Sequence, residues 1–252
     1  MKLEKTKINN LNFWYWSDDK VIGQRIALNK YEKYETAMIL SQINEKSVVV
    51  DVGANIGYYT ILTAKIAKKV YAFEPEKRAF EILQRNVRQN KLKNVVLINK
   101  AVGSENKKVR IKKNKNNFGD SRVVTGKDID CIKLDNLIRE KIDVVKIDVQ
   151  GYEFEVWKGM TKIVKKDKPV IFMEIDRKNI PKIKTDYKFI WSINDFAEVP
   201  WPIYKGVKIL GKAGYADLWM KNKMSSGDYL AILKNINYKK WIKGIINSIW
   251  QK

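Results

Sequence analysis

Short apolar runs and helical apolar patterns alternate through the middle of the chain. The runs of strand length are Val48–Val50, Val70–Phe73, Val95–Ile98, Ile142–Ile147 and Val170–Met173. Between them apolar residues recur at helical spacing, for example from Gly57 to Lys68. Strands that alternate with helices form parallel sheets covered on both faces. The pattern therefore predicts an α/β fold with a Rossmann-like doubly wound sheet, mostly parallel.

The first part of the chain, residues 1–46, has a different pattern. The aromatic stretch Leu11–Trp16, the polar stretch Ser17–Lys20 and the pair Val21–Ile22 predict a short N-terminal hairpin. Tyr31–Ile43 carries apolar residues on one side and predicts a helix. We expect this part to pack on the core of the sheet.

The last part of the chain predicts two further features. Tyr187–Trp191 and Tyr215–Met220 are candidates for an antiparallel terminal strand pair. Residues 223–252 predict a basic amphipathic helical tail, with tryptophan and isoleucine opposite lysine. That pattern is typical of a helix on an anionic membrane, with the contact made through residues 229–252. A helix docked on the protein's own core produces the same pattern and is the more common case.

A glycine turn follows the first apolar run. Asp51 stands at the end of the predicted strand Val48–Val50, and Gly53, Asn55 and Gly57 come next. Glycine and asparagine tolerate positive φ, so the chain can turn sharply into a helix here. A dinucleotide-binding turn has glycine where this chain has Asn55, and a carboxylate beside the turn would repel phosphate. The turn therefore favours a ligand that is positively charged and lacks phosphate.

Acidic residues end four of the predicted strands: Asp51, Glu74, Asp148 and Glu174. Ligands of open α/β sheets bind outside the carboxyl ends of the strands. S-adenosylmethionine fits this edge, since it carries a sulfonium and an ammonium group and no phosphate. Glu74 is placed to accept two hydrogen bonds from a ribose diol. The alternative is a plain strand, turn and helix with surface acids.

Three ordered motifs, Val49–Thr60, Ala72–Pro75 and Asp143–Glu153, resemble the FkbM family of S-adenosylmethionine-dependent methyltransferases. The resemblance spans about residues 30–176 and implies a class I methyltransferase domain, which we place at residues 47–222. It implies S-adenosyl-L-methionine as the cofactor. The residues that we predict to bind it are Asp51, Gly53, Ala54, Asn55, Gly57, Tyr58, Glu74, Pro75 and Ala101.

The stretch after the fourth strand carries the candidate catalytic residues. We rank Asp148 first as the acid nearest the acceptor, then Glu153 and then Glu174. Members of the family often have glutamate where this chain has Gln150, so a base at that position is missing here. Asp148 has two other interpretations: a cap of the following helix, or an oxygen ligand of a metal together with Glu174 and Asp176. We rank the metal lower and assign no metal ligand.

The family resemblance implies an O-methyltransferase that acts on a hydroxyl of a sugar, a glycan or a related small molecule. A nucleic-acid methyltransferase is the first alternative, although the fourth strand does not run into the Asn-Pro-Pro-Tyr sequence of amino-group base methylases. A non-catalytic protein that binds an adenosyl ligand is the second.

Charge alone does not decide between these functions. The formal net charge is +22, from 50 basic and 28 acidic residues, and 42 of the basic residues are lysine. Such a field favours anionic partners. Specific readers of nucleic acid rely more on arginine, and here the lysines are spread along the whole chain. Nucleic acid is thus an alternative partner that we do not favour.

The remaining composition limits the chemistry and the compartment. Histidine is absent, which removes imidazole bases and histidine metal ligands. The single cysteine, Cys131, forms no internal disulfide and suits a reducing interior. No run of 18 apolar residues predicts a membrane span, and Met1–Asn10 lacks the apolar core of a signal peptide. We therefore expect a cytoplasmic protein, with the tail as its one candidate membrane contact.

Overall fold

The computed structural model describes residues 2–8, 10–19, 22–28, 31–112, 121–185, 187, 189–192 and 215–221. Within them a seven-stranded sheet has the order β12-β13-β11-β10-β3-β4-β5. Its parallel strands are β3 (Val48–Val52), β4 (Lys69–Phe73), β5 (Val95–Ile98), β10 (Val144–Ile147) and β11 (Val170–Asp176). Two antiparallel strands complete one edge, β12 (Phe189–Ser192) and β13 (Tyr215–Lys221). The predicted α/β, Rossmann-like fold is confirmed.

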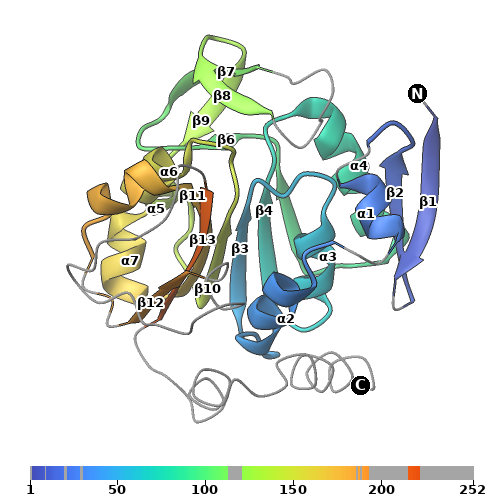
Figure 1. Cartoon of the computed structure of the whole chain (residues 1–252), viewed down its shortest axis with the longest axis horizontal. Coiled ribbons are helices and arrows are strands. Elements are labelled where there is room, and N and C mark those ends of the chain that lie inside the picture. The colour runs from blue at the N-terminus through green and yellow to red at the C-terminus, as the bar shows by residue number, and fades with distance from the viewer. Residues whose placement is uncertain are drawn as a thin grey trace.

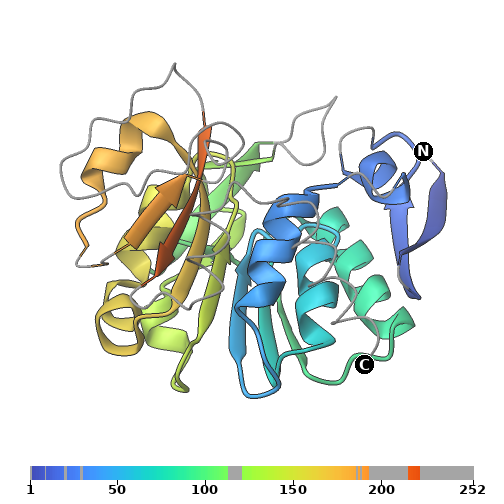
Figure 2. The same cartoon turned by 60° about the horizontal axis from the view of Figure 1, so that its bottom comes forward.

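Helices cover both faces of this sheet (Figure 1, Figure 2). On one side lie α2 (Lys33–Ser41), α3 (Tyr58–Ala64) and α4 (Lys77–Gln89). On the other lie α5 (Leu134–Leu137), α6 (Glu153–Gly159) and α7 (Thr161–Asp167). Successive strand residues alternate between the two cores: Val49 packs with the first set and Val50 with the second. This two-sided burial explains why the parallel strands are apolar at almost every position.

Smaller elements flank the sheet. After β5 the chain forms a four-stranded sheet of order β6-β9-β7-β8. Its strands are β6 (Ala101–Val102), β7 (Lys107–Lys112), β8 (Arg122–Thr125) and β9 (Ile129–Ile132). A 3-10 helix, η1 (Arg177–Lys182), follows β11. No helix among the described residues has the length and apolar character needed to cross a bilayer. The predicted tail, residues 223–252, lies outside the described residues.

The N-terminal hairpin exists, but its position in the prediction is wrong. Leu11–Trp16 is β2, and it pairs with the preceding segment, β1 (Leu3–Ile8), rather than with Val21–Ile22. Ile22 instead precedes a short helix, α1 (Gly23–Ala27). The four residues between Leu3 and Ile8 in β1 are all polar or charged, so the sequence of this edge strand gives a weak strand signal.

Two asparagines, Asn86 in α4 and Asn90 at its C-terminal cap, attach the hairpin to the core. The Asn86 side chain accepts a hydrogen bond from the Trp14 amide and donates one to the Trp14 carbonyl, at 2.6 and 3.1 Å. Asn90 makes the same pair of bonds with the backbone of Asn12, at 2.8 and 2.7 Å. The two amide groups thus satisfy the exposed edge of β2 as a neighbouring strand would.

Three further boundaries shape the sheet and its helices. Helices α6 and α7 are separate, and at the end of α6 a Cβ on Gly159 would lie 2.0 Å from the Gly103 carbonyl oxygen. Glu76 caps α4 by accepting the Ala79 amide at 2.8 Å. Strand β11 extends to Asp176 because β13 pairs with it along its length.

Candidate active site

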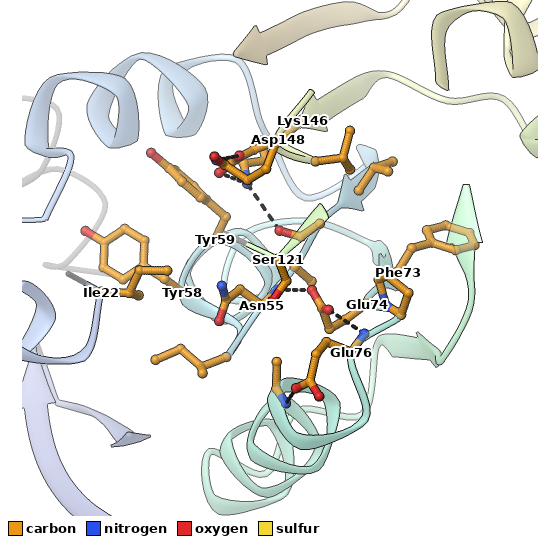
Figure 3. A pocket seen from close by; sticks show the side chains of 18 of the residues that line it. Ile22, Asn55, Tyr58, Tyr59, Phe73, Glu74, Glu76, Ser121, Lys146 and Asp148 are labelled. Atoms are coloured by element: carbon orange, nitrogen blue, oxygen red, sulfur yellow. Dashed lines mark hydrogen bonds and ion pairs between the residues drawn. The ribbon is translucent and has the colours of Figure 1, made fainter. Parts of the chain in front are cut away.

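A cavity of about 260 Å³ opens at the carboxyl ends of β3, β4, β10 and β11 (Figure 3). It has two ends. The glycine-turn end comprises Gly53, Ala54, Asn55, Glu74, Pro75 and Ala101. The carboxylate end comprises Glu32, Tyr59, Lys146, Asp148, Gln150 and Glu174. A second cavity of about 120 Å³ adjoins the carboxylate end, because Glu32, Tyr59, Lys146, Asp148 and Glu174 line both.

Backbone geometry builds the glycine-turn end. Gly53 has φ of +81°, and a Cβ there would lie 1.8 Å from the Asp148 carbonyl oxygen, so only glycine fits. The amides of Gly53 and Ala54 both donate to the Phe73 carbonyl at 2.9 Å, which ties the turn to β4. Asn55 follows with φ of 51°. The turn is therefore fixed between β4 and the end of β10.

Glu74 is held by two backbone amides. Its Oε2 accepts from the Asn55 amide and its Oε1 from the Glu76 amide, both at 2.8 Å. The side chain is only 7% exposed, and burial raises the pKa of Glu74 to about 7 against the opposing effect of these two hydrogen bonds. Each carboxylate oxygen keeps a further lone pair in a residue that lines the cavity. This arrangement fits the 2′- and 3′-hydroxyls of an adenosyl group.

Asp51 lies beside the cavity and does not line it. The residue is inside β3, 1% exposed, and its Oδ2 accepts the Thr60 hydroxyl at 2.6 Å. Its Oδ1 has no hydrogen-bond partner among the described residues, and the Lys146 Nζ is 3.9 Å away. Burial raises the pKa of Asp51, and the Lys146 charge acts in the opposite direction. Glu74 therefore lines the cavity, whereas Asp51 lies behind its wall.

Lys146 is the functional residue that the sequence analysis missed. It is 8% exposed and sits opposite Asp51 in the register of β10 with β3. Its Nζ lies 3.4 Å from Asp148 Oδ2 and 5.1 Å from the centre of the Tyr59 ring (Figure 3). Burial lowers the pKa of Lys146, but the carboxylates of Asp148, Asp51 and Glu32 outweigh it and raise the pKa overall. The clue to Lys146 in the sequence was a lysine inside the strand-length run Ile142–Ile147.

Asp148 is at the centre of the carboxylate end. The Gln150 amide nitrogen donates to Asp148 Oδ1 at 2.8 Å and to Glu174 Oε2 at 3.2 Å. Burial alone would raise the pKa of Asp148, but the Lys146 charge and hydrogen bonds with Glu174 and Gln150 lower it. Lys146 therefore favours the ionised form of Asp148. Gln150, which cannot act as a base, bridges the two acids.

An aromatic wall closes the carboxylate end. The Tyr59 hydroxyl donates to Glu32 Oε2 at 2.7 Å, and the Tyr58 and Tyr59 rings meet edge to face with centroids 5.2 Å apart. Tyr31 packs edge to face on Tyr58 at 4.9 Å. Glu32 has φ of 33°, in the left-handed region, directly before α2. A non-glycine residue in this region is uncommon and is often found at functional sites.

The predicted site residues divide into two groups. Those that line the cavity are Gly53, Ala54, Asn55, Tyr58, Glu74, Pro75, Ala101, Asp148 and Glu174. Asp51, Gly57 and Glu153 are not among its described lining residues. Gly57, with φ of +96°, precedes α3 and packs on Leu83. Glu153 is fully buried, and its Oε1 accepts the Gly151 amide at 2.7 Å, so its contact is with the loop before α6.

Among the described residues, Asp148 neither caps the following helix nor forms a metal site with Glu174 and Asp176. Tyr152, not Asp148, is the N-cap of α6. Asp176 lies away from the pair: it accepts the Lys178 amide at 3.1 Å and pairs with the Lys178 ammonium at 2.6 Å. Among the described residues no cluster of three or more acidic or cysteine side chains is arranged to hold a metal ion.

A Rossmann-like sheet with a glycine turn after its first parallel strand and a buried glutamate after its second is the arrangement expected of a class I S-adenosylmethionine-dependent methyltransferase. The family model for the methyltransferase FkbM domain matches residues 51–198, which is more than half of the chain. The chain therefore belongs to the FkbM methyltransferase family, and S-adenosylmethionine is its methyl donor.

Similar proteins differ in their substrates. Hexuronic acid methyltransferase AglP of Haloferax volcanii is 28% identical over 161 residues, covering 60% of this chain and 66% of that protein. A Methanocaldococcus jannaschii tRNA(Phe) (4-demethylwyosine(37)-C(7)) aminocarboxypropyltransferase is 49% identical over 57 residues, covering 22% of this chain and 23% of that one. The chain thus spans less than two thirds of the length of these curated relatives.

The complex of aTrm5 with tRNALeu provides a structural likeness. It has a TM-score of 0.51 and 17% identity, and the match covers 87% of this chain and 53% of that one. At this level of identity the likeness concerns the fold.

Proposed function

We propose that this enzyme transfers a methyl group from S-adenosylmethionine to a hydroxyl of a sugar, a glycan or a related small molecule. The observation that carries the proposal is the position of Asp148, a carboxylate held by Lys146 and Gln150 in the wall shared by the two cavities. The first cavity has a binding end for the adenosyl group, and the second leaves space for an acceptor beside the same carboxylate.

The glycine-turn end holds the donor in this proposal. Glu74 accepts the ribose hydroxyls, and Ala101 leaves space for the flat adenine ring at the wall. The acidic edge also suits the positive charge of the sulfonium group. When bound, S-adenosylmethionine supplies the methyl group: its carbon–sulfur bond breaks as the bond to the acceptor oxygen forms, and S-adenosylhomocysteine leaves.

The carboxylate end orients the acceptor and takes its proton. Asp148 accepts a hydrogen bond from the reacting hydroxyl and receives its proton as the oxygen becomes methylated. Lys146 and Gln150 fix the two Asp148 oxygens from one side, at 3.4 and 2.8 Å. Glu174, held by the same Gln150 amide group, supplies a second oxygen for a neighbouring hydroxyl. Positioning of this kind is the main contribution that a protein makes to an in-line displacement.

The relatives support a sugar acceptor more strongly than an RNA acceptor. AglP is named for a hexuronic acid, which is a sugar, and its alignment covers 60% of this chain. The tRNA-modifying relative aligns over 22% of the chain, so an RNA acceptor is the second candidate. A protein that binds the donor without turnover is the third. Residues 229–252 stay a predicted contact for an anionic membrane, and a cytoplasmic location stays a prediction.

Labelled S-adenosylmethionine separates these candidates. The protein is incubated with the donor and with separate glycan, lipid, RNA and protein fractions of a cell extract. The proposal expects label in the glycan or small-sugar fraction, and loss of that label with Asp148→Asn. Label in RNA that is lost after ribonuclease treatment would establish the second candidate. Donor binding without transfer to any fraction would establish the third.

A further inference from the structure

The second cavity is strongly acidic. Glu32, Glu35, Asp148 and Glu174 line it, together with the apolar side chains of Ile39 and Phe172. Among the described residues that line it, Lys146 is the single cation. We propose, as a refinement that rests on the proposed function, that this cavity selects sugar acceptors without negative charge. An ammonium-bearing sugar is preferred over the matching neutral sugar and a uronic acid is rejected, so the acceptor of this chain differs in charge from the hexuronic acid in the name of AglP.

The Lys146 charge is already balanced by the protein. Its ammonium group lies 3.4 Å from Asp148 Oδ2 and 3.9 Å from Asp51 Oδ1, and it also donates to the Gly53 carbonyl at 3.5 Å. An incoming carboxylate would have to compete with two carboxylates that are already in place. It would also face Glu32 and Glu174 across the same small space. Like charges at short range disfavour binding, most strongly where water is excluded.

The basic surface does not cancel this effect. The formal net charge of +22 belongs to the whole chain. Interactions between exposed charges are screened over about 8 Å at physiological ionic strength, whereas partly buried charges are screened much less. Arg25 and Lys100 line the first cavity but not the second. The local acids therefore decide which acceptor charge is tolerated.

Three matched probes test the inference: methyl glucoside, methyl glucosaminide and methyl glucuronide, which differ in charge on one sugar framework. Methyl transfer from labelled S-adenosylmethionine gives kcat/KM for each, and calorimetry with S-adenosylhomocysteine-loaded protein gives the affinities. We expect the glucuronide to be at least tenfold poorer than the glucoside in both measurements. The glucosaminide is expected to exceed the glucoside in both measurements, and the differences should shrink from 50 to 500 mM salt.

Two variants locate the source of the selectivity. Glu35→Gln removes one charge from the cavity, and Glu32→Gln removes another, although Glu32 also accepts the Tyr59 hydroxyl. Each is expected to improve the glucuronide-to-glucoside ratio several-fold. Glu45→Gln, which removes an exposed acid outside both cavities, is the matched control and should leave the ratio unchanged.

The outcomes separate the two proposals. Efficient use of the glucuronide, or a ratio unaffected by Glu35→Gln and Glu32→Gln, would overturn the charge selection while the sugar methyltransferase assignment stands. Normal binding of S-adenosylhomocysteine with no binding or methylation of any of the three sugars would overturn the sugar acceptor itself, and the charge selection with it.

Discussion

The two ends of the cavity are built in different ways. The turn and the glutamate of the glycine-turn end lie within residues 53–75, and backbone amides fix both. The carboxylate end combines Glu32, Tyr59, Asp148 and Glu174, which are far apart in the chain and meet only through the sheet register and α2. The glycine-turn end, which is built from one short segment, suits a ligand that the whole family shares. The carboxylate end, which is assembled from distant segments, suits an acceptor that varies between relatives.

The same contrast appears in the acids. Glu74 and Asp148 both follow parallel strands, Glu74 buried and Asp148 half-buried, yet their pKa values shift in opposite directions. Burial raises the pKa of Glu74 to about 7 against the two backbone amides that donate to its carboxylate. Burial also acts on Asp148, but Lys146 reverses the result. The neighbouring cation therefore accounts for the opposite directions of the two pKa shifts.

The largest expected effect is on turnover. Asp148→Asn removes the proton acceptor and keeps the size of the side chain, so kcat should fall by about 10²–10⁴-fold. The affinity for S-adenosylhomocysteine should stay within about threefold, because the glycine-turn end is intact. Radiolabel transfer and calorimetry measure the two quantities. Asp176→Asn, at the end of the adjacent strand, is the control and should retain turnover; equal losses in both variants would remove Asp148 from the mechanism.

Lys146→Met tests how much the Lys146 ammonium group stabilises the carboxylate end. It leaves Asp51 and Asp148 buried without their shared partner, and the free energy of unfolding should fall by about 3–5 kcal/mol at pH 7. Urea unfolding measures it. The pKa of Asp51, which is already raised, then rises further, and the pKa of Asp148 rises above its unfolded value near 3.9. The loss is therefore present at neutral pH and shrinks as pH falls toward 4.

Lys141→Met is the matched control for that variant. Lys141 also pairs with an aspartate, at 2.8 Å from Asp143, but its side chain is 69% exposed. Exposed pairs contribute at most about 1 kcal/mol. A loss for Lys146→Met no larger than the loss for Lys141→Met would show that the buried network does not stabilise the site.

Glu74→Gln should weaken donor binding more modestly. The amide keeps one acceptor oxygen but loses the charge, and hydrogen bonds to a charged group contribute about 1.5–3 kcal/mol. The dissociation constant of S-adenosylhomocysteine should therefore rise about tenfold to a hundredfold, as calorimetry can show. Glu81→Gln, an exposed acid on α4, should bind normally. Unchanged affinity in the Glu74 variant would place the ribose elsewhere.

The smallest expected effect is a pH dependence. Because the pKa of Glu74 is raised to about 7, a proton occupies the carboxyl group at pH 6 and must leave before both ribose hydroxyls can donate. Adenosine, which lacks the methionine amine, should bind about tenfold more tightly at pH 8 than at pH 6. Glu74→Gln should abolish this slope. Equal slopes in the two proteins would assign the titration to another group.

The sequence predicted the sheet and the glycine-turn end well, and the carboxylate end in part. Alternating apolar runs determine the parallel strands, and Gly53 and Glu74 occupy positions that the backbone requires. Lys146 and Glu32 could not be predicted in the same way, since their partners come from other strands and helices. Asp51 was predicted at the strand end, but β3 includes it and turns it toward Thr60.

A structure of the protein with S-adenosylhomocysteine tests the central claim most directly. The account predicts ribose hydroxyls on the Glu74 carboxylate, adenine beside Ala101, and the sulfur directed toward the end of the cavity that holds Asp148. A ribose away from Glu74, or an adenosyl group seated in the second cavity, would contradict the assignment of the two ends.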